Sequence, residues 1–288
     1  MDRADLHSPA CQLVLVQLFA LMRRMQALQL DYSSWYGRLA AWPSPWEFLN
    51  RGADYEPWPG NPDELRIPWF LLWEIAWVVA NTPLQPGSRV LDMGGAASLF
   101  ACFLAARGHE VIAIDINPEL ISHTHALARA AGWRLSARQM DMQALDFPPN
   151  HFAHVFSLCV LEHLPVCGRV ACSEKVAAIL QPGGTASYTF DYANPQSFGR
   201  LDSPADVHQQ IIEPARLAVR SNRTFHDSGQ RYLDAPAYFG LGRASAFANR
   251  LGAWVRGDID RRRVRNRDRR YTFGAVFLEK PSDRAAVR

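Results

Sequence analysis

The stretch that decides the fold runs from Arg89 to Phe100 and reads Arg-Val-Leu-Asp-Met-Gly-Gly-Ala-Ala-Ser-Leu-Phe. Val90, Leu91 and Asp92 are typical of the end of a buried parallel strand. Gly94 and Gly95 then predict a tight turn, and residues 97–106 predict a helix. A strand, a turn of small residues and a helix follow one another in this way where an α/β sheet opens a nucleotide pocket.

The aspartate inside this stretch limits the kinds of ligand that the turn could bind. A helix N-terminus attracts anions, but a carboxylate at Asp92 would repel a pyrophosphate. The same carboxylate suits a ligand that carries an ammonium or sulfonium centre. The contrast favours S-adenosylmethionine over NAD, and an ordinary strand-to-helix turn without a ligand is the alternative.

Length and composition indicate a globular protein with a sizeable core. The chain has 288 residues, of which 48% are hydrophobic and 20% are charged. These values fit one large domain or a domain with a cap. The formal net charge is +3 and the pI is near 8.7, which is too mild to indicate nucleic-acid binding by itself.

The cysteines and histidines indicate the redox environment of the protein and whether the sequence predicts a metal site. The five cysteines form no Cys-x-x-Cys pair, and Cys102, Cys159 and Cys172 lie in apolar sequence. We therefore expect buried thiols and a reducing, cytoplasmic location. The histidines are scattered, so the sequence predicts no metal site.

The N-terminal region gives no sign of membrane insertion. Residues 11–22 are apolar, and Arg23 and Arg24 end the run. This run is shorter than the roughly 20 residues that a membrane span needs. It also lacks the basic n-region and the cleavage site of a signal peptide. We expect an amphipathic helix that packs on the body of the protein.

Residues 1–85 are predicted to form a helical cap and linker before the sheet. Seven of the nine tryptophans fall there, and prolines interrupt residues 31–61, which predicts loops. Helices are expected at 13–30 and 68–80. Glu74 is the one charge inside the second helix, and it either faces solvent or makes a polar contact in a ligand site.

Residues 86–288 are predicted to form the sheet domain, with an insertion at about 193–270. Strand-like runs alternate with helical segments about five times, which predicts a doubly wound, mostly parallel, Rossmann-like sheet. Its seven strands are expected at residues 90–92, 110–115, 135–140, 154–158, 185–191, 217–220 and 271–278. Further helices are expected at residues 118–128, 170–180, which Pro182, Gly183 and Gly184 would end, and 205–212.

Three acids follow successive predicted strands. They are Asp92, Asp115 and Asp141. The carboxyl ends of parallel strands meet at one edge of a sheet, where ligands bind. There Asp115 can accept both ribose hydroxyls, and Asp141 can accept from an adenine amino group beside the apolar Met142. Each acid alone could be a helix cap or a surface charge, but three in phase favour a site.

Several short motifs together resemble the class I S-adenosylmethionine-dependent methyltransferases. The resemblance covers roughly residues 86–192, with residues 271–280 as the usual last strand. The motifs are specific to the superfamily, and none of them identifies the methyl acceptor. They are Val-Leu-Asp-Met-Gly-Gly (90–95), Val-Ile-Ala-Ile-Asp (111–115), Asp-Met-Gln-Ala-Leu (141–145), Phe-Ala-His-Val-Phe-Ser-Leu-Cys-Val-Leu-Glu-His-Leu (152–164) and Leu-Gln-Pro-Gly-Gly (180–184).

The resemblance implies a complete cofactor site. The glycine-rich turn would face the methionine part, the end of the second strand the ribose, and the residues after the third strand the adenine. The fourth strand would line the site with backbone groups. The implied cofactor-binding residues are Asp92, Gly94, Gly95, Ala96, Asp115, Ile116, Asp141, Met142, Ser157 and Leu158.

The chain departs from the family pattern at two places. The family's turn usually has glycine at every second position after its acid, whereas this chain has Gly94, Ala96 and Ser98. The replacements are small, so binding should be kept with a tighter fit. An acid often follows the position of Phe152, and here Ala153 replaces it, which we interpret as a local change.

Methyl transfer needs few catalytic groups from the protein, because the sulfonium methyl is already activated. Alignment of the acceptor and removal of its water can supply much of the rate. A hydroxyl acceptor would also gain from a base near its proton. His163 is the first candidate for this base, and His208, His226 and Asp191 are weaker ones. Alternatively, Glu162 and His163 only shape a loop.

Other functions are open at this point. A nicotinamide-dependent dehydrogenase shares the fold, but Gly-Gly-Ala-Ala-Ser does not fit Gly-x-Gly-x-x-Gly. An RNA methyltransferase could use residues 256–270, which hold eight arginines against three aspartates. A non-catalytic S-adenosylmethionine-binding or partner protein is the third alternative. We expect methylation of a small molecule, on oxygen or nitrogen, with the aromatic cap over the acceptor.

Overall fold

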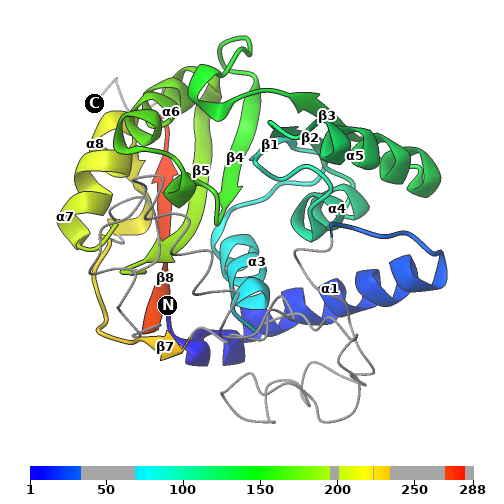
Figure 1. The fold of residues 1–288 in the computed structure, drawn as a ribbon, viewed down its shortest axis with the longest axis horizontal. Helices are drawn as coiled ribbons and strands as arrows, with labels where there is room; N and C mark the ends of the chain where they lie inside the picture. The colour runs from blue at the N-terminus through cyan, green and yellow to red at the C-terminus, as the bar shows by residue number, and fades with distance from the viewer. Residues whose placement is uncertain (34–68, 195–200, 223, 234–269, 283–288) are drawn as a thin grey trace, which may run out of the picture.

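A mixed, mostly parallel β-sheet forms the centre of the molecule (Figure 1). The computed structural model describes residues 1–33, 69–194, 201–222, 224–233 and 270–282. The strand order is β3-β2-β1-β4-β5-β8-β6, and a short β7 also pairs with β8. The strands are β1 (Arg89–Met93), β2 (Glu110–Asp115), β3 (Leu135–Gln139), β4 (Phe152–Leu158), β5 (Leu180–Tyr192), β6 (Ala218–Val219), β7 (Tyr232–Leu233) and β8 (Arg270–Glu279).

Strands β1 to β5 run parallel, and β8 lies antiparallel between β5 and β6. The seven-stranded, Rossmann-like sheet predicted from the sequence is therefore confirmed. The central strands β1, β2 and β4 are buried on both faces, as their apolar runs require, whereas the edge strand β3 alternates between buried and exposed residues.

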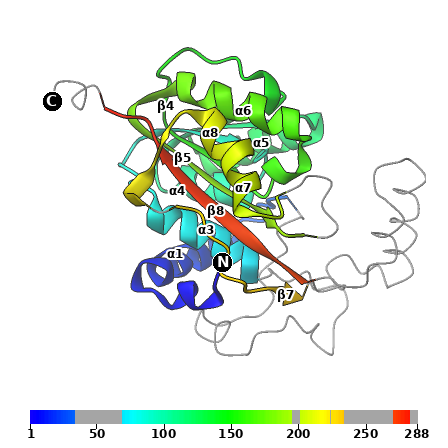
Figure 2. The same cartoon turned by 90° about the vertical axis from the view of Figure 1, so that its left-hand side faces the viewer.

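Helices cover both faces of the sheet (Figures 1 and 2). On one face, α1, α3, α4 and α5 share a hydrophobic cluster with the strands. On the other face, α6 and a helix over residues 204–215 pack on a second cluster. The principal helices are α1 (Pro9–Ala27), α3 (Trp69–Asn81), α4 (Leu99–Ala106), α5 (Pro118–Ala131) and α6 (Val166–Ile179).

The N-terminal helices belong to the same core as the sheet. Trp73 of α3 is 1% exposed and stacks on Trp77, with ring centroids 5.8 Å apart. The indole N–H of Trp73 donates to Asp5 in the short helix η1 (Arg3–His7). The division at residue 85 stays a prediction, and Trp35, Trp42, Trp46 and Trp58 lie outside the described residues. Across the described ranges, no helix is long and apolar enough to cross a membrane.

Helix α4 begins two residues later than predicted, for a local reason. Ala97 has a positive φ of 55°, which a right-handed helix does not allow. Ser98 then takes the N-cap position, and its Oγ accepts from the backbone N–H of Ala101 at 2.8 Å. The serine cap therefore sets the start of the helix.

The helix predicted to end before Pro182, Gly183 and Gly184 does end there, but the next strand begins earlier than the predicted residue 185. Helix α6 stops at Ile179, and strand β5 starts at Leu180. Residues 181–184 lie within β5 as a bulge, because the register steps from the pair Phe152 and Leu180 to the pair His154 and Thr185. A Cβ on Gly184 would lie 2.8 Å from the carbonyl oxygen of Gln181, so the bulge needs a glycine there.

The helix predicted at 205–212 is longer and less regular than expected. It consists of α7 (Pro204–Val207), a π-helical turn (His208–Ile212) and α8 (Glu213–Ala215). Within the predicted insertion at about 193–270, the structure describes residues 193–194, 201–222, 224–233 and 270. The arginine-rich segment at 256–270 lies outside the described residues apart from the first residue of β8, so its role stays a prediction.

Candidate active site

The carboxyl ends of β1, β2, β3 and β4 lie side by side at one edge of the sheet, because these strands are parallel neighbours. The structure therefore brings together the regions that the sequence predicted to bind the cofactor. Asp92 is the fourth residue of β1 and Asp115 is the last of β2. Asp141 caps the short helix η3 (Met142–Ala144) after β3.

The turn after β1 folds tightly over Asp92. Gly94 has a positive φ of 79°, and its N–H donates to the carbonyl of Ile114 at 2.8 Å. A Cβ on Gly95 would lie only 1.8 Å from Oδ2 of Asp92. The close packing of backbone on carboxylate explains why small residues are needed here.

Asp92 is 2% exposed, and its carboxylate packs against the backbone of the turn at Gly95. The hydroxyl of Ser98 donates to its Oδ2 at 3.1 Å. Burial raises the pKa of Asp92 to about 7, and nearby Asp115 adds to the rise. The structure thus shows Asp92 as an internal support of the turn, and a direct contact with the methionine part of the cofactor stays a prediction.

At the end of β2, an acid and an exposed apolar side chain stand next to each other. The backbone N–H of Asn117 donates to Oδ1 of Asp115 at 2.9 Å, which fixes the carboxylate. Ile116 is 72% exposed, which is unusual for a large apolar residue. A carboxylate beside an uncovered apolar side chain suits a ribose followed by a flat base.

The residues after β3 serve first as a helix cap. Oδ1 of Asp141 accepts from the backbone N–H of Gln143 at 2.9 Å, and the Gln143 side chain also donates to the carboxylate. Asp141 is exposed, whereas Met142 is buried. Asp141 can therefore still face a ligand, while Met142 belongs mainly to the core.

Residues at the end of β4 have buried side chains. Ser157 is completely buried, and its hydroxyl donates to the carbonyl of Met93 at 3.3 Å. Leu158 is 7% exposed. Neither side chain offers a polar atom to a ligand, so their predicted contribution rests on main-chain groups.

His163 ends the short helix η4 (Leu161–His163) and is exposed. Desolvation of its ring lowers the pKa of His163 from the ordinary value. A neutral imidazole near pH 7 can accept a proton, so the role of base stays a prediction. Of the weaker candidates, His208 lies on the π-helical turn near Glu213, and His226 lines a cavity described below.

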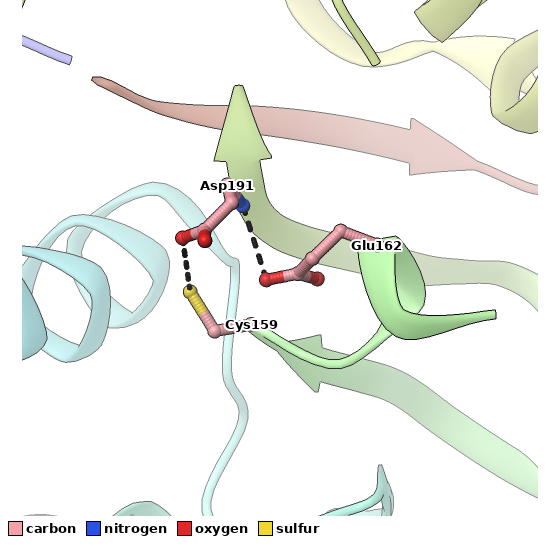
Figure 3. A group of neighbouring side chains, drawn as sticks. All are labelled: Cys159, Glu162 and Asp191. Atoms are coloured by element: carbon pink, nitrogen blue, oxygen red, sulfur yellow. Dashed lines mark hydrogen bonds between the residues drawn. The ribbon is translucent and has the colours of Figure 1, made fainter. Parts of the chain in front are cut away.

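Four side chains that the sequence did not group meet beside this edge. We call Glu74, Cys159, Glu162 and Asp191 the acid–thiol cluster. Figure 3 shows Cys159, Glu162 and Asp191 converging from the residue after β4, from η4 and from β5. The thiol of Cys159 donates to Oε1 of Glu74 at 2.6 Å and lies 3.9 Å from Oδ1 of Asp191.

Two sequence-based expectations change here. Cys159 does not lie in apolar surroundings, because three carboxyl groups flank it. Glu74 does not face solvent, because it is 1% exposed. Burial raises the pKa of Glu74 to about 8, although its contacts with Cys159 and Thr189 oppose the rise. The pKa of the buried Glu162 lies well above its ordinary value for the same reason, and Asp191 adds to it.

A cavity of about 780 Å³ opens near the start of β8. It lies between η1, α3, β8 and residues 224–228, and both aromatic and polar side chains line it. Phe225 also contacts Tyr192, with ring centroids 5.1 Å apart. The aromatic lining residues are Trp73, Trp77, Tyr192, Phe225, Phe273 and Phe277.

Comparison with known proteins identifies the domain. Residues 90–184 match the family described as "Methyltransferase domain". A ubiquinone biosynthesis O-methyltransferase from Xanthomonas campestris is 32% identical over 156 residues, which are 50% of this chain and 64% of the relative. An uncharacterized protein from Mycobacterium tuberculosis is 31% identical over 108 residues, which are 38% of this chain and 39% of that protein. The chain thus spans less than two thirds of these relatives.

Solved structures agree on the fold. The [4+2]-cyclase SpnF superposes with a TM-score of 0.52 and 18% identity, over 95% of this chain and 96% of its own. The YcgJ protein from Bacillus subtilis superposes with a TM-score of 0.51 and 16% identity, over 73% and 98% of the two chains. Together with the strand order and the family match, this shows that the chain contains a class I S-adenosylmethionine-dependent methyltransferase domain.

The residues present fit the cofactor of that class, S-adenosylmethionine. The turn at Gly94 and Gly95 packs its backbone against Val160 and Asp92, where a Cβ would clash, so small residues shape the turn beside the predicted cofactor site. Asp115 and Ile116 supply a fixed carboxylate and an uncovered apolar surface at the next strand end. The residues fit the adenosine part of the cofactor more clearly than its methionine part, because Asp92 is buried beneath the turn.

Proposed function

We propose that this chain is an S-adenosylmethionine-dependent methyltransferase that methylates a small molecule. The observation that carries the proposal is the placement of Asp92, Asp115 and Asp141 at the ends of three adjacent parallel strands. Fold alone does not select this reaction, because one of the matched structures is described as a cyclase. The family match over residues 90–184 supports methyl transfer specifically.

The cofactor, when bound, supplies a methyl group on a positively charged sulfur. The chain then has to bind the acceptor, align its nucleophilic atom and keep water away. An oxygen acceptor is favoured over nitrogen, because the relative from Xanthomonas campestris is named an O-methyltransferase.

We place the acceptor's apolar part in the aromatic cavity of about 780 Å³. Tyr192, which lines the cavity, directly follows Asp191 of the acid–thiol cluster in the same strand. Aromatic walls with polar edges suit a ring-containing acceptor. The cavity therefore supports a small, ring-containing molecule better than it supports a macromolecule.

The cofactor part of the proposal is tested with Asp115→Ala. Calorimetry should show that S-adenosylmethionine and S-adenosylhomocysteine bind the full chain and that NADH does not. The variant should lose about 1.5–3 kcal/mol of binding free energy, as expected for hydrogen bonds to a charged group. Asp146→Ala removes an exposed acid outside the site and serves as the matched control. Equal affinity in both variants would remove Asp115 from the site.

The acceptor part is tested with Trp77→Ala. Ring-containing hydroxyl compounds are incubated with the full chain and the cofactor, and the products are followed by mass. For an acceptor found in this way, Trp77→Ala should raise KM by about tenfold, a loss of roughly 1.4 kcal/mol, while S-adenosylhomocysteine affinity stays the same. Trp133→Ala changes a tryptophan outside the cavity and is the control. An unchanged KM would place the acceptor elsewhere.

A further inference from the structure

Three side chains of the acid–thiol cluster are placed as a set of metal ligands. Cys159, Glu162 and Asp191 each offer one ligand atom, and these atoms all lie within 4.8 Å of one another. Cys159 and Glu162 lie in the loop and short helix directly after β4, Asp191 lies near the end of β5, and the three side chains point toward a common centre (Figure 3). The pairing of β4 with β5 therefore brings the set together.

The carboxylates are held in orientation by their neighbours. The backbone N–H of Asp191 donates to Oε1 of Glu162 at 3.1 Å. The side chain of Asn194 donates to Oδ2 of Asp191 at 2.6 Å, and Oδ1 of the same carboxylate faces the sulfur. Hydrogen bonds of this kind orient ligands around bound metal ions.

A second observation indicates that something other than protein completes the cluster. Glu162 is 1% exposed, yet its Oε2 has no hydrogen-bond partner. Within the described part of the chain, its side chain forms no ion pair. A buried carboxylate oxygen without a partner is costly, so such atoms are usually satisfied by a ligand.

The ligand types select among ions. A thiolate with two carboxylates suits a borderline divalent transition ion such as Zn²⁺, whereas Mg²⁺ and Ca²⁺ prefer oxygen alone. Zinc binds sulfur at about 2.3 Å and carboxylate oxygen at about 2.0–2.2 Å. Around such an ion the ligand atoms would lie roughly 3.5 Å apart, so side-chain rotations need to close about 1 Å.

We propose that Cys159, Glu162 and Asp191 bind a zinc-type divalent ion at the carboxyl end of β4 and β5. Three protein ligands leave a fourth position open, as in catalytic zinc sites rather than structural ones. Glu74 borders the ion through its contact with the sulfur. The inference goes beyond the proposed methyl transfer and does not depend on it, because it concerns ion binding by the chain itself.

The test uses Co²⁺ as the probe on the full chain after treatment with a chelator. A thiolate bound to Co²⁺ gives an intense charge-transfer absorption in the near ultraviolet. We expect this absorption to saturate at one ion per chain, to be displaced by Zn²⁺, and to be unaffected by a tenfold excess of Mg²⁺. Elemental analysis of the chain loaded with Zn²⁺ should give the same stoichiometry.

Three variants test the proposed ligands, and a fourth variant is the control. Cys159→Ser should abolish the charge-transfer absorption, and Glu162→Gln and Asp191→Asn should each weaken Co²⁺ binding by about 100-fold or more. Cys167→Ser removes an exposed thiol on α6 and should bind as the natural chain does. Binding of S-adenosylhomocysteine and circular dichroism confirm that each variant is folded.

Two results would overturn the proposal. One is the absence of saturable charge-transfer absorption in the natural chain. The other is an absorption that persists in Cys159→Ser, because another thiol would then be the ligand. If Cys159→Ser does not fold, the near-isosteric Asp191→Asn decides, and unchanged Co²⁺ affinity in that variant refutes the site.

Discussion

The substitution Gly95→Ala offers a direct check on how the turn after β1 is built. The added Cβ would lie 1.8 Å from Oδ2 and 2.6 Å from Oδ1 of Asp92, and the carboxylate is buried. Gly95 does not have a positive φ, so backbone strain does not contribute and the effect is steric. Overpacking of this kind destabilises a protein by about 1–3 kcal/mol.

The assay is urea unfolding of the full chain, combined with calorimetry of S-adenosylhomocysteine binding. A loss of about 1–3 kcal/mol corresponds to a fall in Tm of roughly 2–10 °C for a chain of this size. Cofactor affinity should also fall by about tenfold or more, because the turn must shift away from the carboxylate of Asp92 to make room for the added Cβ atom.

A double-mutant cycle with Asp92→Ala separates the clash from other effects. Without the carboxylate, the new Cβ has room, so Gly95→Ala should cost much less in that background. The coupling free energy should reach about 1–3 kcal/mol. Additive losses, or an unchanged free energy of unfolding in Gly95→Ala, would show that the turn is not packed on Asp92 as described.

Two further predictions concern histidines. His163→Ala should lower kcat by about 100-fold while S-adenosylhomocysteine affinity is kept, if the imidazole accepts the acceptor's proton; a fall in activity that only follows lost stability would make His163 structural. Burial lowers the pKa of His154 to about 4, so the unfolded chain binds its proton below about pH 6.5 while the folded chain does not. Stability should therefore fall by up to about 3 kcal/mol between pH 6.5 and 4, and His154→Gln should flatten this part of the urea-unfolding pH profile. An equally steep profile in the variant would assign the acid sensitivity to other groups.

The sheet could be predicted from the sequence because its signals are local. The apolar strand at residues 90–92, the glycine turn and the acid-ended strand at 110–115 each need only short-range information. Asn117 followed by Pro118 marked the start of α5 correctly, since an N-cap and an N1 proline act within one turn. The chain order of strands and helices then limited the topology.

Features that depend on tertiary packing escaped the sequence analysis. Pro182, Gly183 and Gly184 are typical of a helix end, but their place in a bulge of β5 depends on the pairing of β5 with β4. The burial of Glu74 could not be predicted from its position in an apolar helix. It involves a contact with Cys159, which is 85 residues later in the sequence.

The candidate site was predictable in part. Asp92, Asp115 and Asp141 were found because strand ends in a parallel sheet share an edge. The same reasoning could not show that Asp92 is enclosed beneath the turn, since this follows from the close approach of Gly95. The acid–thiol cluster was missed because its residues come from α3, from the residue after β4, from η4 and from β5. One signal was available, namely a lone glutamate in an otherwise apolar helix.

The place of β8 in the sheet governs how the protein can form during synthesis. β8 pairs with β5 along Thr272–Glu279 and also carries the edge strand β6, although roughly 80 residues of chain separate β8 from β5. Until β8 leaves the ribosome, β5 has an unpaired edge that contains Tyr188 and Phe190, and such an edge is prone to intermolecular pairing. The pairs from Tyr192 with Thr272 to Thr185 with Glu279 join residues far apart in sequence, and such non-local pairing slows folding. Production of the chain should therefore depend on protection of that edge by chaperones while the intervening residues are made.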